Sequence, residues 1–121
     1  MINLSDDLIK VVKYRRRDNK LNYIYIGRKF GDLEGSILKN KFKIGRDGNR
    51  EEVIVKYKRW LWMEMKKGIK GEKNEVWEYL KYLSKLVKEG KEIELACWCK
   101  PRACHGDVVK LALKWMIGEG Y

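Results

Sequence analysis

The sequence predicts an α/β fold: one small domain over residues 1–121, with a mostly parallel sheet of about four strands and about three helices. Two observations predict it. Short segments rich in β-branched and aromatic residues alternate along the chain with longer segments of helical periodicity. Near the C-terminus a continuous apolar segment, a turn and an apolar helical segment follow one another, which is half of a βαβ unit. The chain length and its 45% apolar content suit a single core.

The first two strands are expected near the N-terminus. Residues 9–15 alternate weakly between apolar and polar side chains, and residues 22–28 are rich in β-branched and aromatic side chains before Gly27. Asp18 and Asn19, which lie between these segments, have the side chains that favour a turn. Both segments are therefore expected in the sheet.

A long basic segment comes next. Residues 29–49 contain several glycines and lysines, and only residues 42–44 form a short candidate strand. Loops of this length are typically functional or mobile, because they lack a regular hydrogen-bond ladder of their own. This segment is therefore a candidate part of a binding site.

The clearest helix begins after Asn49, which suits an N-cap, and has Glu51 and Glu52 in its first turn. Gly68 and Gly71 are expected to break the chain after it. The apolar stripe of this helix consists of Val53, Ile54, Tyr57, Trp60 and Leu61.

A second helix is expected from the cap residue Asn74 to Gly90, whose lack of a side chain suits the position after a helix end. Residues 92–99 then become continuously apolar, as a buried central strand would, and residues 108–117 form an apolar helix. If the strands at residues 22–28 and 92–99 are parallel, both end at the same edge of the sheet, where open α/β sheets bind ligands.

The positive charge is concentrated in one half of the chain. The net charge is +11, and residues 10–59 hold 16 Lys and Arg against 6 Asp and Glu, while the rest holds 12 against 11. Such a field attracts polyanions, so a nucleic acid or nucleotide partner is expected. The alternative is a Lys-rich and Glu-rich surface of the hyperthermophile type, since the chain has no Gln and no Thr.

The sequence indicates a cytoplasmic protein that does not enter a membrane. No apolar run reaches the roughly 18 residues that a membrane span needs, and the N-terminal segment lacks an apolar secretory core. Reduced thiols are the default there, although a Cys97 to Cys104 disulfide stays open because intracellular disulfides are more common in hyperthermophiles. Four tryptophans are assigned to the core or to a dimer interface, namely Trp60, Trp62, Trp98 and Trp115.

One motif holds all three cysteines, the only histidine and the only proline of the chain, within residues 95–107. Zinc accepts thiolate and imidazole ligands, and side chains two apart on a strand share a face. The spacing nevertheless differs from the paired Cys-x-x-Cys pattern that is typical of zinc sites. The zinc interpretation uses Cys97, Cys99, Cys104 and His105.

Two other interpretations of this motif stay open. The thiol of Cys104 at a helix N-terminus is expected to have a lowered pKa, with His105 as a base oriented by Asp107, although neighbours in sequence rarely form such a relay. Alternatively the cysteines are buried as small hydrophobes, and the turn forms one wall of a ligand pocket. In that case Gly106 permits close approach, and Arg28 and Arg102 attract an anion near the helix start.

Four segments combine into a wider pattern: YIGR at residues 25–28, residues 35–42, residues 50–61 with Tyr57 and Trp60-Leu61, and CWCKPRACHGD at residues 97–107. Together they resemble a small family of uncharacterised phage and prokaryotic proteins. The family pattern is YIGR, Ser-x-x-x-Asn-Pro-Phe, an Arg-containing helix with Tyr and Trp-Leu, and Cys-x-Cys-x-Pro-x-x-Cys-His. The resemblance covers residues 22–113 and departs at Lys41, where the family usually has proline.

The resemblance implies a protein carried by a virus or mobile element, and a single site that gathers Arg28, Asn40, Arg50 and the turn at residues 97–107. It implies no particular reaction. Such a site fits either a pocket for a nucleotide-like anion or a turn stabilised by a metal.

We therefore expect a small basic protein that binds a phosphate-bearing ligand, either nucleic acid or a nucleotide, between the YIGR loop and this turn. Its expected ligand-binding residues are Arg28, Asn40, Cys99, Arg50, Arg102 and Gly106. Two alternatives stay open: a nucleotide-processing enzyme that uses Cys104, His105 and Asp107, and a zinc-stabilised interaction protein that uses Cys97, Cys99, Cys104 and His105.

Overall fold

The computed structural model describes residues 7–16 and 22–121, and within them it contains a parallel three-stranded sheet. The strands are β1 (Ile9–Lys13), β2 (Tyr23–Tyr25) and β3 (Ile93–Cys97), in the order β1-β3-β2. Both outer strands run parallel to β3. The α/β class and the parallel arrangement are thus confirmed, while the turn expected at Asp18 and Asn19 lies outside the described residues.

β3 is the central strand, and apart from Glu94 its residues are apolar. All five of its residues are buried, as the continuous apolar run predicts. In the register of the sheet, Leu95 lies opposite Val11 of β1 and Ile24 of β2. The parallel direction brings the carboxyl ends of β2 and β3 to the same edge of the sheet.

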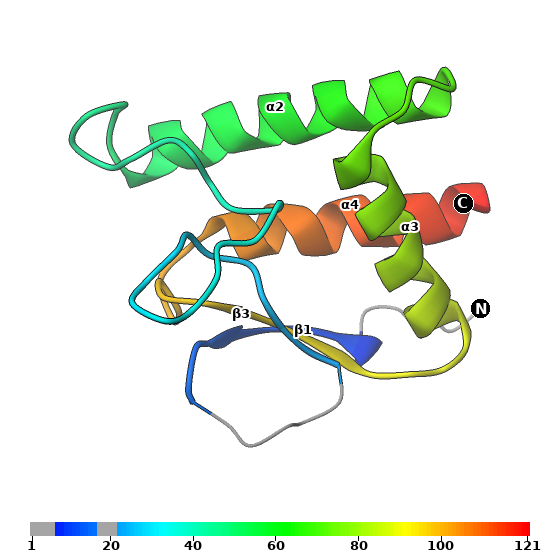
Figure 1. Ribbon diagram of the computed structural model, residues 1–121, viewed down its shortest axis with the longest axis horizontal. Helices are drawn as coiled ribbons and strands as arrows, with labels where there is room; N and C mark the ends of the chain where they lie inside the picture. Colours follow the sequence, from blue (N-terminus) through cyan, green and yellow to red (C-terminus); the bar gives the residue numbers. More distant parts are fainter. Residues whose placement is uncertain (1–6, 17–21) are drawn as a thin grey trace.

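Three long helices complete the described fold: α2 (Arg50–Ile69), α3 (Glu75–Lys88) and α4 (His105–Glu119). Figure 1 shows them on one side of the sheet, with α4 lying between the sheet and α2. α3 packs against α2, α4 and β3 at the end of the molecule where α2 ends and the C-terminus lies. The core fills the space between these layers, and Leu61, Leu80, Leu95 and Leu113 are almost fully buried there.

The expected fourth strand at residues 42–44 is not formed. The amide of Phe42 donates to Oδ1 of Asn40 at 2.9 Å, and the amide of Lys43 donates to Oδ2 of Asp47 at 2.7 Å. Side-chain acceptors therefore take the donors that a sheet ladder would need, as Asn and Asp commonly do in turns. Residues 42–44 belong to the long loop instead.

The helix ends follow the expected capping chemistry with one correction. Asn49 and Glu52 form a reciprocal capping box at the start of α2, and Asn74 accepts from the amide of Trp77 at the start of α3. Gly68 does not break the chain but lies inside α2, where a Cβ atom would sit 2.1 Å from Cγ of Trp77. Glycine is thus needed there for close contact between α2 and α3, and α2 ends at Ile69.

α4 begins at His105, earlier than the periodicity predicts. The amide of Cys104 donates to Oδ2 of Asp107 at 3.1 Å, and this bond stabilises the first turn. No helix in the described part of the chain is long and apolar enough to cross a membrane.

A cavity at the carboxyl edge of the sheet

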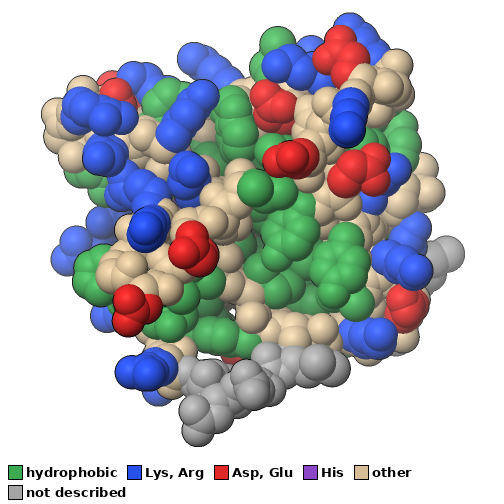
Figure 2. Space-filling view, viewed as in Figure 1, with side chains coloured by type: hydrophobic (Ala, Val, Ile, Leu, Met, Phe, Trp, Pro, Cys, Tyr) green, Lys and Arg blue, Asp and Glu red, His purple; other side chains and the backbone are tan. Residues whose placement is uncertain are grey.

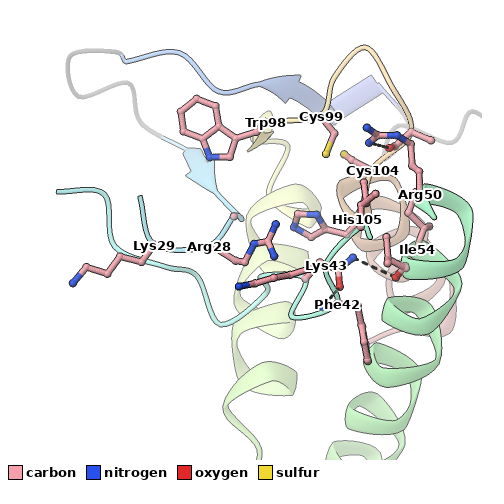
Figure 3. Close-up of a pocket in the computed structure, with 15 residues that line it drawn as sticks. Arg28, Lys29, Phe42, Lys43, Arg50, Ile54, Trp98, Cys99, Cys104 and His105 are labelled. Atoms are coloured by element: carbon pink, nitrogen blue, oxygen red, sulfur yellow. Dashed lines mark hydrogen bonds between the residues drawn. The ribbon is translucent and has the colours of Figure 1, made fainter. Parts of the chain in front are cut away.

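The main candidate site is a cavity of about 540 Å³ at the carboxyl ends of β2 and β3. It lies between the long loop and the first turns of α2 and α4 (Figure 3). Its polar and aromatic lining includes Arg28, Lys29, Lys43, Arg50, Trp98 and His105. The parallel direction of the two strands is what brings these distant segments together.

Tyr25 connects the YIGR loop to the cysteine-rich turn. Its hydroxyl donates to the carbonyl oxygen of Arg28 and accepts from Nε1 of Trp98 at 2.8 Å. The ring folds back over Gly27, where a Cβ atom would lie 2.3 Å from the Tyr25 hydroxyl oxygen. The Tyr-Ile-Gly-Arg segment therefore forms a compact loop that fixes the backbone beside the cavity.

His105 makes a second connection between the two motifs. Its Nε2 lies 2.7 Å from the carbonyl oxygen of Ile26, and its ring packs edge-on against Tyr57 with centroids 5.0 Å apart. Burial lowers the pKa of His105, and the positive charge of Arg28 lowers it further. The ring is therefore neutral near pH 7, donates from Nε2 to Ile26, and keeps Nδ1 as its acceptor nitrogen.

Arg50 fixes the start of α2 to the turn that precedes α4. Its Nη1 donates to the carbonyl oxygen of Ala103 at 3.1 Å (Figure 3). Asn40 is also used to position backbone, since its Nδ2 donates to the carbonyl oxygen of Val53 at 3.3 Å. Tyr57 of α2 reaches the same loop, and its hydroxyl donates to the carbonyl oxygen of Leu38 at 2.6 Å. Asn40 and Tyr57 thus hold the long loop against α2.

The thiols of Cys97 and Cys104 form a buried pair, with their Sγ atoms 2.8 Å apart. The hydrogen bond with Cys104, together with the amides of Cys99 and Lys100, lowers the pKa of Cys97 to about 6. The same bond and burial raise the pKa of Cys104. The sequence places the lowered pKa at Cys104, whereas the contact between the two thiols favours it at Cys97.

The structure does not join Cys104, His105 and Asp107 into a catalytic relay. Oδ2 of Asp107 accepts from the amide of Cys104, and its Oδ1 lies 2.6 Å from Nζ of Lys100. Cys104 bonds to Cys97, and His105 bonds to Ile26. The three side chains occupy the same turn, but each has a different partner.

The four residues of the zinc interpretation are likewise not brought together as ligands. Over residues 7–16 and 22–121, no group of three or more His, Cys, Asp or Glu side chains has an arrangement that could hold a metal ion. Cys97 and Cys104 face each other, whereas Nε2 of His105 is directed to Ile26. The tetrahedral set of three thiolates and one imidazole is not assembled in this structure.

The remaining expected residues fall in three places. Cys99 lines the main cavity together with Arg28, Asn40 and Arg50. Arg102 lines a second cavity next to it. Gly106 lines neither, because it packs against the sheet, where a Cβ atom would lie 2.7 Å from Cγ1 of Val11.

Sequence reasoning missed Lys29, Lys43 and Trp98 as residues of the cavity. Lys29 follows Arg28 directly, so its position beside the strand end could have been expected. Trp98 and Cys99 follow the end of β3, and strand periodicity would place them on opposite faces, so periodicity does not predict that both line this cavity. Lys43 comes from the irregular loop, and no periodic signal marks it.

The charges around the cavity have one sign. Arg28, Lys29, Lys43 and Arg50 line it, and no Asp or Glu does so among the described residues. Figure 3 shows Arg28 and Lys43 near the His105 ring, whereas Lys29 extends away from them. Lys and Arg side chains also gather on the surface over the long loop and the start of α2 (left in Figure 2). The site therefore presents a positive potential in a concave surface.

These features define a small α/β protein with a positively charged cavity at the carboxyl edge of a parallel sheet. A family model described as "Domain of unknown function (DUF4326)" matches residues 10–115, and the chain belongs to this family. The resemblance to a family without an assigned function is thereby confirmed. No match was found among curated proteins or among solved structures.

Proposed function

We propose that this protein binds a phosphate-bearing ligand, a nucleotide or a nucleic acid, in the cavity at the carboxyl edge of the sheet. One observation carries the proposal: four cationic side chains and no carboxylate line the cavity in the described structure. Concave surfaces with one sign of charge concentrate the opposite charge, and phosphate is the commonest anionic group of such ligands. The proposal places this binding in the cytoplasm.

The cations are available to a ligand to different degrees. Within the described residues, Arg28, Lys29 and Lys43 form no ion pair, and all three are exposed. Arg50 donates from Nη1 to the carbonyl oxygen of Ala103. This bond fixes the guanidinium group, so the directions of its remaining N–H donors are also fixed. Three exposed cations and one positioned guanidinium suit an anion with several oxygen atoms.

The surroundings of the cations also favour an anion. The start of α4 lies at the cavity through Cys104 and His105, so the positive end of the helix dipole faces the same region. His105 is neutral near pH 7, so it adds no charge of either sign. The nearest carboxylate of the turn, Asp107, is already paired with Lys100 at 2.6 Å. The four cations of the lining therefore outnumber the negative groups near it, which are the paired Asp107 and the thiolate that the lowered pKa gives Cys97.

The proposal predicts binding that depends on phosphate and on salt. A fluorescein-labelled single strand of about 12 nucleotides should bind with a slope of log K against log salt of about −2 to −3, since about three to four phosphates are neutralised. Fluorescence polarisation between about 50 and about 200 mM salt measures this slope. Adenosine monophosphate should displace the strand at high concentration, whereas adenosine, which has no phosphate, should not.

Two results would count against the proposal. One is a lack of binding to any of these probes at low salt. The other is binding that does not weaken with salt and is displaced equally well by adenosine, because then neither the cations nor the phosphate would contribute.

A further inference from the structure

We propose that the ligand is a single-stranded polynucleotide whose bases stack on Trp98 and Phe30 while its phosphates follow cations across two adjoining cavities. This inference rests on the proposed function and narrows it from phosphate-bearing ligands in general to one class. It is carried by the second cavity and by the exposed aromatic side chains beside the first, neither of which the binding of a single phosphate requires.

The second cavity has a volume of about 520 Å³ and adjoins the first, since Arg50, Trp98 and Cys99 line both. Pockets for one small molecule have volumes of about 300–1,000 Å³. Each cavity is therefore large enough for a nucleotide-sized group, and the two together exceed the needs of one. Because they share a wall, a ligand that fills both must pass over Trp98 and Cys99.

Positive charge continues from one cavity into the other. Lys13, Lys100 and Arg102 line the second cavity, and no Asp or Glu lines it in the described part of the chain. Lys100 is already paired with Asp107, which leaves Lys13 and Arg102 as the cations without an ion pair there. Cations on both sides of a shared wall match a chain of phosphates better than one phosphate group.

The shared wall contains one exposed aromatic side chain, Trp98, and Phe30 packs beside it. Trp98 is 43% exposed although it is a large apolar side chain, and Phe30 beside it is 66% exposed. Their ring centroids are 5.2 Å apart. Exposed aromatic rings next to cations are the surface on which unpaired bases stack, because every base has an apolar face.

Two tyrosine side chains hold the Trp98 ring in place. Tyr14 packs against it with centroids 4.8 Å apart, and Nε1 of Trp98 donates to the hydroxyl of Tyr25 at 2.8 Å. A fixed ring loses little conformational freedom when a base stacks on it, which favours binding. Bases inside a duplex already stack on each other, so a platform of this kind selects single strands.

The test compares affinity across ligand length with matched tryptophan variants. Thymidine monophosphate and oligothymidylates of about 2, 4, 8 and 12 nucleotides are titrated against the full chain at one salt concentration. We expect affinity to rise at least about tenfold from the mononucleotide to about 8 nucleotides. Trp98→Ala should lower the affinity for the long strand at least about fivefold, and Trp98→Phe should retain most of it.

Trp62→Ala is the matched control, because Trp62 is 42% exposed and packs against Trp115 away from both cavities. Its affinity should equal that of the unmodified protein, and thermal melts of all variants show whether the fold is kept. Equal affinity for the mononucleotide and the long strand would overturn this inference and leave the proposed function intact. Tighter binding of a duplex than of the single strand would also overturn it, whereas no binding of any probe would overturn both.

Discussion

Replacing Arg28 and Lys43 together by glutamate is expected to lower the affinity for a single strand of about 12 nucleotides at least about a hundredfold, or ~2.7 kcal/mol. These two cations lie near His105 on the same side of the cavity. The double variant removes their phosphate contacts and adds repulsion, since like charges at a binding surface cost several kcal/mol. Polarisation titrations of both proteins at low salt measure the ratio of affinities.

The control for this variant must change the net charge equally. Lys73→Glu with Lys85→Glu does so at the other end of the molecule, because Lys73 follows the C-terminal end of α2 and Lys85 lies on α3. α2 has 20 residues, which places its two ends ~30 Å apart. This control should lose only the small part of the affinity that arises from the overall field. Equal losses in the two double variants would mean that the cavity is not the binding site.

Gly68→Ala is expected to destabilise the protein by at least about 2 kcal/mol, although alanine is ordinarily favoured over glycine in a helix by about 1 kcal/mol. A Cβ atom at this position would lie 2.1 Å from Cγ and 2.4 Å from Cβ of Trp77. Trp77 is buried between α2 and α3, so neither helix can move without opening the core. Chemical denaturation followed by circular dichroism measures the change in the free energy of unfolding.

Gly118 provides the matched control, because it also lies inside a helix but a Cβ atom there would meet no atom within 4 Å. Gly118→Ala should be neutral or slightly stabilising, since only the helix preference changes. If the Gly68→Ala variant were as stable as the unmodified protein, this result would contradict the close contact between α2 and α3.

Much of the fold could be predicted because local patterns determine it. The continuous apolar run at the third strand indicates its central and buried position, and β3 is buried throughout. Asn49 and Asn74 mark the starts of α2 and α3, since their side chains accept from free amides of the first turn. The common edge of β2 and β3 then follows from the parallel arrangement.

The errors arose where a contact distant in sequence decided the outcome. Glycine is a common helix breaker, but Gly68 lies inside α2, where it leaves room for Trp77. Cys104 stands at a helix start, yet its thiol contacts Cys97 at 2.8 Å, and this contact and burial raise its pKa. Local sequence patterns do not predict contacts between residues that are far apart in the sequence.

The candidate site was predicted in part. Arg28, Asn40, Arg50 and Cys99 do line one cavity. Arg28 and Cys99 follow strand ends and Arg50 starts α2, so the topology brings these three together, whereas Asn40 comes from the long loop. Lys43 could not be assigned to it, since it belongs to an irregular loop whose path depends on bonds such as that from Tyr57 to Leu38. Gly106 lines neither cavity, and its close contact is with Val11, which depends on the packing of α4 on β1.

The central claim is that the cavity at the carboxyl edge of the sheet binds the phosphate-bearing ligand. The most direct test is an NMR titration of the isotope-labelled protein with an oligothymidylate of about 12 nucleotides, which maps the amide shifts along the chain. We predict that the largest shifts fall at Gly27, Arg28, Lys43, Cys104 and His105, while the amides of α3 stay unchanged. Shifts confined to α3 or to the apolar face between α2 and α4, or no shifts at all, would contradict the claim.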